Sequence, residues 1–525
     1  MNWTPNRVAF DRLIAVLLAE VDAAFIVGGA VRDYLRNPES KVADLDVVIA
    51  ERALPIARRV ADRLGWAYFP MGTGHDVARL VFPGEQGPAL TCDFAGMRGF
   101  TIEDDLAARD FTVNAMAIVL ASGTPPRLLD PYGGRQDLEA GVLRRVSPVS
   151  LLQDPVRLLR AVRLMVQFDL DIDPVTRSQV ERLTETIRLT STERSRDELW
   201  KMLASPHPRE AIELLLGFGL LRYVFPEVAA MQGVQQSPPH NLDVYHHTLA
   251  TVAAAGTLRD WIDKGVQPVN DPNLEQVIDL LRPFQFDLMR HFSHQVASGR
   301  GRSQWLVWHA LFHDTGKPGT ASLEDAGEEA NAVAQDGDGN RTQLRRRFHG
   351  HEILGAELAT HRLTELRFSS TEVAMCAAIV RAHMRPHLLD NSFATGEISR
   401  RAAFRFFRDV GGKQFGRGLG VDTLVLALAD YLATYGGLPH AWPTYRAHIG
   451  QLLEDYFAVE PGKTTALVPL VNGHELMHIL GIEQGVVVGN LLEQVMEAQV
   501  AGEVSTRSGA IELAQRLYRE ETRIH

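Results

Sequence analysis

The stretch Gly28-Gly29-Ala30-Val31-Arg32-Asp33 follows a short apolar run, Ala24-Phe25-Ile26-Val27, and opens a helical pattern. Glycine lets backbone N–H groups approach a ligand, and the N-terminus of the following helix favours a phosphate group. Eleven residues after Asp33 the chain continues with Asp44-Leu45-Asp46 and then three apolar residues. Residues i and i+2 of a strand point to the same face, so we expect both carboxylates to project together while Leu45 packs behind them.

Two carboxylates held side by side repel each other unless a cation lies between them. Asp44 and Asp46 therefore indicate a site for divalent metal ions, which would align a nucleoside triphosphate with an attacking hydroxyl group. Asp93, near the end of a strand predicted over residues 89–94, offers a third carboxylate. A Gly-Gly turn or an Asp-x-Asp pair alone is usually only a turn or a solvated strand edge, so it is their order that favours a site.

The bulk composition is that of a globular protein, with 45% hydrophobic and 23% charged residues, and 525 residues predict three or four domains. Cys92 and Cys376 are the only cysteines, so a disulfide framework is excluded and a reducing compartment is expected. Neither a signal-peptide pattern nor a run of eighteen apolar residues occurs, so we expect a cytoplasmic protein without membrane contact. The net charge of −11 argues against a nucleic-acid partner only weakly, because binding requires a local basic surface.

The periodicity of the chain changes near residue 146. Strand patterns at residues 24–27, 45–50, 77–82 and 89–94 mix with helical patterns before it, whereas the later chain is predicted to be helix after helix. This predicts an α+β fold, with a small N-terminal α/β head and mostly helical domains after it. We expect four domains, over residues 1–146, 147–232, 233–458 and 459–525, and a mobile surface loop over residues 324–340.

Four further motifs follow the first one, at residues 109–117, 130–138, 153–160 and 193–199. In this order the five motifs resemble those of class II CCA-adding enzymes and bacterial poly(A) polymerases. The resemblance implies a polymerase β-like nucleotidyltransferase head over residues 1–146 and a helical neck for nucleobase selection and RNA binding over residues 147–232. It also implies template-independent transfer of CMP, and with it AMP, from CTP and ATP to the 3′ end of tRNA. The expected cofactor is Mg²⁺, and no obligate protein partner is expected.

The resemblance assigns roles to individual residues of this chain. Asp44 and Asp46 would be catalytic and bind Mg²⁺, with Asp93 as a third catalytic carboxylate. The expected nucleotide-binding residues are Gly28, Gly29, Arg32, Asp33, Arg109, Asp110, Asn114, Asp154, Arg157, Arg160 and Arg163.

Asp154 and Arg157 stand three residues apart in a predicted helix, so their side chains are expected on one face. A carboxylate accepts hydrogen bonds and a guanidinium donates several, so the pair could imitate the Watson–Crick edge of a partner base. The resemblance implies this base-reading role. The alternative is an ordinary salt bridge on a neck helix.

Three departures from the family pattern leave alternatives open. Ala108 stands where a second arginine is usual before Asp110, and Gln153 replaces a usual glutamate. Only residues 94–102 separate the Asp93 strand from the next acidic helix, a short form that resembles CC-adding relatives. The alternatives are therefore an enzyme that adds only CC, a poly(A) polymerase, and an RNA-binding or regulatory protein with an inactive transferase head.

A second candidate site begins at His313-Asp314, an adjacent pair that offers one nitrogen and one oxygen ligand to a metal ion. A single histidine on a helix is more often a surface or core residue than a ligand. The full set resembles the HD phosphohydrolase superfamily, over residues 233–458. The resemblance implies a metal set of His247, His313, Asp314 and Asp430, a second-metal pair of His351 and His383, and possible substitutes in His246, His349 and His387.

The HD resemblance implies a divalent transition metal, with Ni, Mn, Co and Fe as candidates, and a phosphomonoesterase or cyclic phosphodiesterase activity. The helical tail over residues 459–525 resembles the C-terminal segment of the same enzymes, where RNA contact and simple packing are equal alternatives. A second arginine-dense stretch, Arg341 with residues 345–347, could likewise contact RNA or form a solvated surface.

Overall fold

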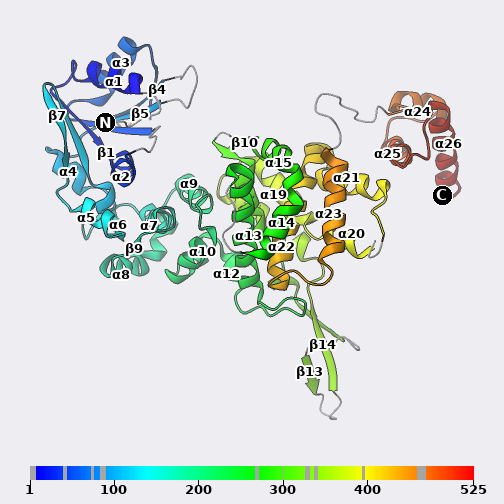
Figure 1. The fold of residues 1–525 in the computed structure, drawn as a ribbon. Coiled ribbons are helices and arrows are strands. Elements are labelled where there is room, and N and C mark those ends of the chain that lie inside the picture. The colour runs from blue at the N-terminus through cyan, green and yellow to red at the C-terminus, as the bar shows by residue number, and fades with distance from the viewer. Residues whose placement is uncertain are drawn as a thin grey trace. The chain divides into compact units, whose positions relative to one another are not determined.

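The computed structural model divides into two compact units, one of residues 1–205 with 213–223 and one of residues 206–212 with 224–525. Figure 1 shows the succession of helices and strands in each. The structure describes residues 7–38, 44–71, 76–82, 90–265, 271–297, 299–325, 332–335, 341–392, 396–457 and 469–524.

The first unit is built on a seven-stranded sheet with the order β3-β4-β5-β2-β1-β6-β7. β2 and β5 run parallel to each other, and the other neighbouring pairs are antiparallel. The strands are β1 (Ala23–Val27), β2 (Asp44–Ile49), β3 (Ala67–Pro70), β4 (Val77–Phe82), β5 (Leu90–Gly96), β6 (Ala117–Ala121) and β7 (Thr124–Leu129). The four strands expected from the sequence are all present, and the predicted α+β class is confirmed.

Three helices pack on this sheet or at its edges: α1 (Arg7–Leu17), α2 (Gly29–Arg36) and α3 (Ala53–Leu64). Apolar side chains of α1, α3 and the central strands form one buried cluster, which includes Leu13, Val60 and Phe94. On β2 the buried Leu45 and Val47 alternate with the exposed Asp44 and Asp46. The strand therefore presents its carboxylates on one face because its other face is anchored in the core.

In the first unit α4 (Ile102–Ala107) lies between β5 and β6 in the chain, and α5 (Gly134–Glu139) follows the sheet. The helices after it are α6 (Ser150–Gln153), α7 (Val156–Phe168), α8 (Pro174–Leu183) and α9 (Thr192–Leu203), and α10 (Pro208–Gly217) has residues in both units. α7 buries apolar side chains along most of its length, among them Leu158, Leu159 and Val162. It packs against α9, and this pair carries the arginines and the glutamate described below.

The second unit is a bundle around three helices, α13 (Val244–Lys264), α16 (Arg302–Phe312) and α22 (Leu419–Tyr435), and the last two are buried on nearly every face. A helix that is apolar all round belongs in the interior of a bundle. Around them lie α12 (Pro226–Ala229), α14 (Pro272–Leu281), α15 (Gln285–Phe292), α17 (Lys317–Thr320), α18 (His351–Glu365), α19 (Ser370–Ala382), α20 (Arg385–Ser392), α21 (Arg400–Phe415) and α23 (Trp442–Phe457).

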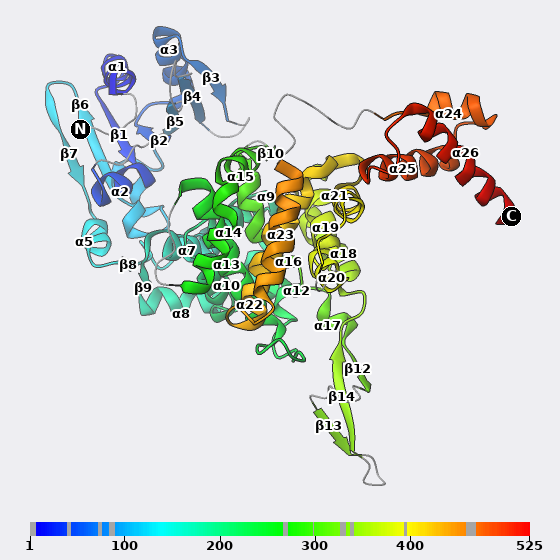
Figure 2. The same cartoon turned by 45° about the vertical axis from the view of Figure 1, so that its right-hand side comes forward.

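The surface loop expected over residues 324–340 is in part a small sheet. β12 (Ser322–Asp325) and β13 (Ala332–Gln335) pair on either side of β14 (Arg341–Arg347), and Figure 2 shows this sheet beside α17. Residues 326–331 and 336–340 of the expected loop lie outside the described residues. The prediction missed these strands because their side chains are mostly charged or small, so they carry no apolar alternation.

The tail contains α24 (Gly473–Leu480), α25 (Val486–Val500) and α26 (Arg507–Ile524), which share an apolar cluster of their own. Glu497 of α25 is buried and accepts hydrogen bonds from Arg405 and Arg408 of α21. These ion pairs favour packing as one role of the tail.

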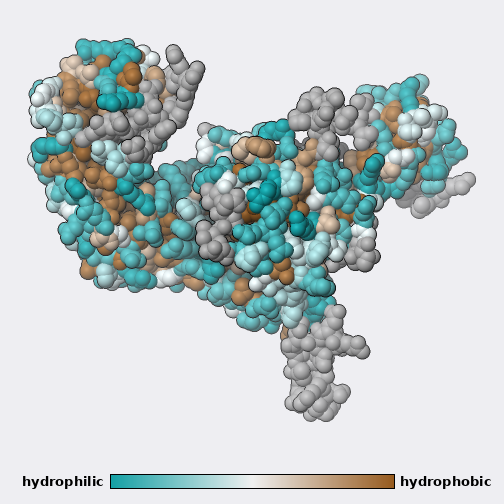
Figure 3. Space-filling view, in the orientation of Figure 1, coloured by the Kyte–Doolittle hydropathy of each residue, from teal (hydrophilic) through white to brown (hydrophobic). Residues whose placement is uncertain are grey.

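In the part of the chain that the structure describes, no helix combines the length and the apolar character needed to cross a membrane. On the face shown in Figure 3, hydrophilic residues prevail over the second unit, and hydrophobic residues occur singly or in small groups. Scattered apolar residues of this kind are normal on a folded surface.

His309 in the last turn of α16 predicts a specific pH dependence of stability. Its side chain is fully buried, neither ring nitrogen has a hydrogen-bond partner among the described residues, and burial lowers its pKa from 6.5 to about 4. The unfolded chain therefore binds a proton at a higher pH than the folded chain, and the free energy of unfolding should fall by up to about 3 kcal/mol as the pH drops through this window. Denaturant unfolding between pH 7 and 4 measures it.

The variant His309→Leu should lose this part of the pH dependence. The matched control is His361→Leu, because the side chain of His361 is 70% exposed on α18. An unchanged slope in His309→Leu would contradict the assignment.

Candidate active sites

The first candidate site lies where β2 and β5 run side by side. Asp46 is directly opposite Asp93 in the strand register, and Asp44 lies two residues earlier on β2. The pKa of Asp46 is raised because the surrounding protein displaces water from it and the carboxylates of Asp93 and Asp44 add negative charge. The structure thus brings together the three carboxylates expected from the sequence, in an arrangement that a divalent cation would relieve.

Arg79 of β4 is a member of this site that the sequence did not reveal. Its guanidinium donates two hydrogen bonds of 2.8 Å each to the two carboxylate oxygens of Asp93, and the two residues are opposite each other in the β4–β5 register. Asp93 therefore already has a hydrogen-bonded cationic partner, whereas Arg109 acts on Asp46 through its charge. Only knowledge of the strand pairing could have predicted this contact.

Gly28 allows the glycine turn to approach the carboxylates closely. Its φ angle is +73°, and a Cβ atom there would lie 2.9 Å from Nη1 of Arg109 and 3.3 Å from Oδ2 of Asp46. Arg109 is held from its other side by Asp105 of α4, whose Oδ2 accepts hydrogen bonds of 3.1 and 3.2 Å. The turn, Arg109 and Asp46 therefore converge on one point, where an incoming phosphate would meet backbone N–H groups and a guanidinium.

A chain of hydrogen bonds joins the glycine-turn helix to the neck. Arg32 donates to Asn114 (2.6 Å), and Asn114 donates to Asp110 (3.1 Å). Arg160 of α7 donates to Asp110 (3.0 Å) and to Glu198 of α9 (2.9 Å). The chain continues at one end to Asp33, which accepts from Arg32 (2.9 Å), and at the other to Arg163, which donates to Glu198 (2.6 Å).

The charged state of this chain is fixed by its own partners. Burial alone would raise the pKa of Asp110, but the charge of Arg160 and its hydrogen bond outweigh this effect, and the pKa is lowered. The pKa of Glu198 is lowered in the same way by Arg163 and Arg160. Both carboxylates are therefore ionised. The positive charges of Arg32, Arg160 and Arg163 are balanced inside the protein by the carboxylates that they contact.

The expected base-reading pair has a different geometry from the one predicted. Asp154 precedes α7 in an extended conformation, so it does not share a helical face with Arg157. Its carboxylate accepts hydrogen bonds of 3.0 and 2.6 Å from Arg194, while Arg157 lies 3.8 Å away. The contact three residues apart is therefore present at 3.8 Å, but the two residues are not on one helix, because α7 begins at Val156 with Pro155 as its N-cap.

Arg157 instead binds backbone carbonyl groups. Its guanidinium donates to the carbonyl oxygens of Ser150 (2.8 Å), Ala108 (2.8 Å) and Arg109 (3.2 Å), and the residue is 8% exposed. It therefore fixes the backbone of the segment that presents Arg109 to the site.

The short connection after β5 is a turn that a side chain stabilises by hydrogen bonds. It consists of residues 97–101, because β5 ends at Gly96 and α4 begins at Ile102. The Asp104 side chain accepts hydrogen bonds of 3.0 Å each from the backbone N–H groups of Phe100 and Thr101. The short form expected from the sequence is present.

The second candidate site is a buried cluster of histidines and aspartates in the helical unit. The six residues expected there form two groups, in each of which the ligand atoms lie within 4.8 Å of one another. They come from α13, α22 and the ends of α16, α18 and α19, so five helices contribute. The groups are His247, His313 and Asp430, and Asp314, His351 and His383.

The histidines of this cluster turn the same ring nitrogen inward. Nδ1 of His313, His351 and His383 each faces the carbonyl three residues earlier, at 2.8, 2.8 and 2.6 Å. A carbonyl only accepts, so each Nδ1 carries the proton and each Nε2 presents a lone pair to the centre. The Nε2 atoms of His351 and His383 lie 3.3 Å apart, as do those of His247 and His313. Facing lone pairs at this distance fit a metal ion between them.

Asp314 connects the two groups. Its Oδ2 lies 3.2 Å from Nε2 of His313, whereas its Oδ1 lies 3.5 Å from Nε2 of His351. Oδ2 is buried and accepts no hydrogen bond of good geometry among the described residues, although Nζ of Lys317 is 2.6 Å away. One carboxylate oxygen thus faces each group, which is the arrangement of a ligand shared by two divalent ions.

The other histidines considered from the sequence lie outside these groups. His246 and His349 have side chains that are 59% and 76% exposed. His387 approaches the cluster only through Asp430, whose Oδ2 is 3.3 Å from its Nε2, and its ring stacks on Tyr445. Lys317, which contacts Asp314, was not singled out from the sequence.

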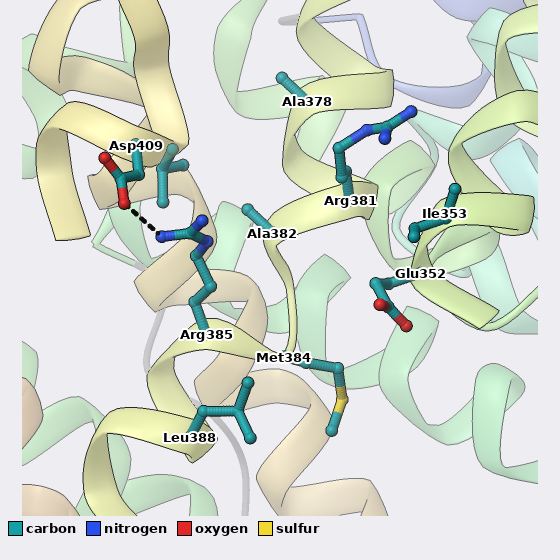
Figure 4. A pocket seen from close by; sticks show the side chains of 10 residues that line it. Glu352, Ile353, Ala378, Arg381, Ala382, Met384, Arg385, Leu388 and Asp409 are labelled. Carbon is teal, nitrogen blue, oxygen red and sulfur yellow. Dashed lines mark hydrogen bonds and ion pairs between the residues drawn. The ribbon is translucent and has the colours of Figure 1, made fainter. Parts of the chain in front are cut away.

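A pocket of about 360 Å³ adjoins the second group and is lined by the start of α18, the end of α19, the middle of α21 and the start of α20 (Figure 4). Oε2 of Glu352 in its wall lies 3.5 Å from Nδ1 of the ligand His351. Arg385 is paired with Asp409 at 2.9 Å, and Arg381 also lines the pocket.

Comparisons with known proteins match the regions of the chain that contain the two candidate sites. Three family models match: "Poly A polymerase head domain" over residues 24–144, "Probable RNA and SrmB- binding site of polymerase A" over residues 169–232, and "HD domain" over residues 244–435. The chain is 34% identical to the A-adding tRNA nucleotidyltransferase of Deinococcus radiodurans, over 95% of this chain and 96% of that protein. The chain belongs to the tRNA nucleotidyltransferase family. It is also 30% identical to the CC-adding tRNA nucleotidyltransferase of Thermus thermophilus, over 93% of this chain and 92% of that protein.

Solved structures agree in fold with this member of the tRNA nucleotidyltransferase family. The CCA-adding enzyme of Thermotoga maritima in complex with tRNA matches with a TM-score of 0.56 at 20% identity, over 98% of this chain and 97% of that chain. A CCA-adding enzyme in complex with CTP matches with a TM-score of 0.58 at 19% identity, over 98% of this chain and 96% of that chain.

Family membership confirms the resemblance stated from the five motifs and the prediction of an enzyme with an HD domain. It also supports dependence on metal ions, because such heads and HD domains use them and this chain has groups that can hold metal. The alternative of a regulatory protein with an inactive head is not favoured.

Gly316 provides a structural test of the second site. A Cβ atom there would lie 2.1 Å from the carbonyl oxygen of His351, so α18 can approach the His-Asp turn only because this residue is glycine. Gly316→Ala should increase the distance between Asp314 and His351 and lower the free energy of unfolding of the second unit by about 1–3 kcal/mol. It should also reduce the amount of metal retained per chain. Thermal unfolding and elemental analysis measure both.

Gly489→Ala is the control, because a Cβ atom at Gly489 within α25 would meet nothing within 4 Å. Equal melting temperatures and metal contents for the two variants would contradict the close-approach argument.

Proposed function

We propose that this chain transfers CMP from CTP to the 3′ hydroxyl of tRNA without a nucleic-acid template, with release of pyrophosphate. The observation that carries the proposal is the exposed pair Asp44 and Asp46, opposite Asp93 and beside Arg109. The 3′ oxygen would attack the α-phosphorus of CTP, and the bond from that phosphorus to the bridging oxygen of the pyrophosphate would break.

Asp44 and Asp46 would hold Mg²⁺, for which oxygen ligands are the preferred donors. When bound, the ion supplies charge neutralisation on the triphosphate. Arg109 and the backbone N–H groups after Gly28 would bind the phosphates, and Asp93 would help to orient the reacting groups while Arg79 holds it in place. Asp154 with Arg194, which the structure pairs, would form the polar edge that meets the incoming base.

Addition of AMP is a second candidate activity. It is favoured by the 34% identity to the A-adding relative over 95% of this chain, whereas the short connection at residues 97–101 favours C addition. The donors would be CTP and ATP, and the acceptor would be tRNA in both cases. We further propose that residues 1–146 and 147–232 form the transferase head and neck, and that residues 233–458 and 459–525 form the hydrolase domain and a tail.

The decisive experiment is sequencing of the 3′ ends made from three tRNA substrates, ending before CCA, after one C and after CC. Each is incubated with CTP alone, ATP alone or both. C addition to the first two substrates supports the main proposal, and A addition confined to the CC substrate supports the second. Open-ended A addition would instead indicate a poly(A) polymerase.

The control for this experiment is the double variant Asp44→Ala, Asp46→Ala. It should lose transfer by at least about a thousandfold and keep tRNA binding, because the pair holds the metal and not the RNA. Asp62→Ala, at a 61% exposed position of α3, should transfer like the natural chain. Unchanged transfer in the double variant would overturn the assignment.

We propose for the second site a metal-dependent hydrolysis of phosphate monoesters or 2′,3′-cyclic phosphates at RNA ends. His247, His313 and Asp430 would hold one divalent ion, His351 and His383 a second, and Asp314 both. Four nitrogen and two carboxylate ligands suit Mn, Co, Ni or Fe. When bound, the ions lower the pKa of a water molecule, which attacks the phosphorus while the ester oxygen leaves. The adjoining pocket is large enough for the nucleoside part of an ester.

Removal of one ligand should separate the two metal positions. His383→Ala is expected to lower the metal content from two ions to one per chain and to abolish hydrolysis of 2′,3′-cyclic nucleotides, while transfer to tRNA continues. His349→Ala is the matched control, because its side chain is 76% exposed on the same unit. Two ions per chain in His383→Ala would show that His383 is not a ligand.

A further inference from the structure

His240 lies against the metal-ligand cluster without belonging to it. It ends the segment of residues 236–240, which precedes α13, and its ring meets that of His247 edge to face at a centroid distance of 4.9 Å. Nδ1 of His240 is buried and has no hydrogen-bond partner among the described residues. A polar ring atom left unpaired next to six ligands is costly to bury, which indicates that it meets a group absent from the protein itself.

The same segment reaches the cluster at a second point. Nζ of Lys317 donates to Oε1 of Gln236 at 2.7 Å and lies 2.6 Å from Oδ2 of Asp314. Lys317 is 6% exposed, so its ammonium group is held inside the protein at the edge of the ligand groups. One of its three N–H groups is donated to Gln236, so the ammonium group can also donate to another acceptor.

The position of the segment is fixed by the small sheet of β12, β13 and β14. The backbone N–H of Arg346 donates to Oγ of Ser237 at 2.8 Å, and the guanidinium of Arg345 donates to the carbonyl oxygen of Pro238 at 3.1 Å. His240 is thus attached to a segment that is held from its outer side, which suits a binding group more than a loose surface side chain.

The chemistry of the cluster shows what His240 and Lys317 can contribute. The four histidine Nε2 atoms and the two carboxylates are all lone-pair donors, so bound metal uses them and leaves no N–H group for a substrate. A phosphate group needs hydrogen-bond donors as well as metal, because its oxygens are acceptors. An imidazole carries at least one N–H group in every protonation state, and an ammonium carries three.

We infer that His240 and Lys317 bind the phosphate group of the hydrolase substrate beside the two ligand groups, as substrate-binding residues and not as metal ligands. The inference rests on the proposed hydrolase function and adds the groups that hold its substrate. Lys317 supplies the positive charge, and His240, whose ring lies against that of His247, supplies a directed hydrogen bond.

The experiment uses the full-length chain loaded with Mn²⁺ and inorganic phosphate as the probe. Metal per chain is determined by elemental analysis, phosphate affinity by calorimetry, and folding by transfer to tRNA at the other site. His240→Phe keeps the ring shape and removes both nitrogens, while His240→Gln keeps an N–H donor. His246→Phe is the matched control, because His246 is a neighbouring histidine whose side chain is 59% exposed.

We expect His240→Phe to keep the metal content of the natural chain and to bind phosphate about tenfold more weakly, the loss for one hydrogen bond to a charged group. His240→Gln should recover part of the affinity, and His246→Phe should behave like the natural chain. A lower metal content in His240→Phe would make His240 a ligand and overturn the inference, as would unchanged phosphate affinity.

The outcomes for the natural chain separate this inference from the proposed function. Metal-loaded natural chain that binds phosphate but hydrolyses no phosphate ester would overturn the hydrolase proposal and leave the binding residues assigned. Metal-loaded natural chain that binds no phosphate would overturn the inference.

Discussion

The ionised carboxylate of Asp110 is the constraint on which the geometry of the transferase site depends. An unpaired carboxylate buried in this position would cost on the order of several kcal/mol in lost hydration. Arg160 and Asn114 provide the compensating charge and hydrogen bond, and each is tied to a further partner. Because Asp110 follows Arg109 in the chain, fixing the carboxylate also fixes the guanidinium beside Gly28 and Asp46.

This constraint makes head and neck one unit. The hydrogen bonds run from Arg32 at the glycine turn to Glu198 on α9, and residues 1–205 form a single compact body. The change of periodicity near residue 146 therefore marks a change of secondary structure and not a gap in the contacts. In the cluster of histidines and aspartates the carboxylates also have partners within the protein, since Nε2 of His247 lies 2.9 Å from Asp430 and Nζ of Lys317 lies 2.6 Å from Asp314.

Sequence patterns predicted those structural features that depend on residues close to one another along the chain. The alternation around Leu45 gave the strand and its carboxylates, and motif order gave six ligands that the structure brings together. Contacts set by strand register or tertiary packing were missed, as with Arg79, which meets Asp93 only because β4 pairs with β5. The three carbonyl groups that Arg157 binds were also missed, because they lie in a segment that tertiary packing brings to α7 and in the short helix before it.

The sheet formed by β12, β13 and β14 has a consequence for how this chain can vary. It is inserted between the ligands Asp314 and His351, yet its two ends are paired, with Ser322 opposite Arg347. Strand pairing at the base of the insertion therefore offsets the entropic cost of closing this loop. Residues beyond the base add little to that cost. The part of the insertion beyond this base could therefore be lengthened or shortened while Asp314 and His351 keep their separation.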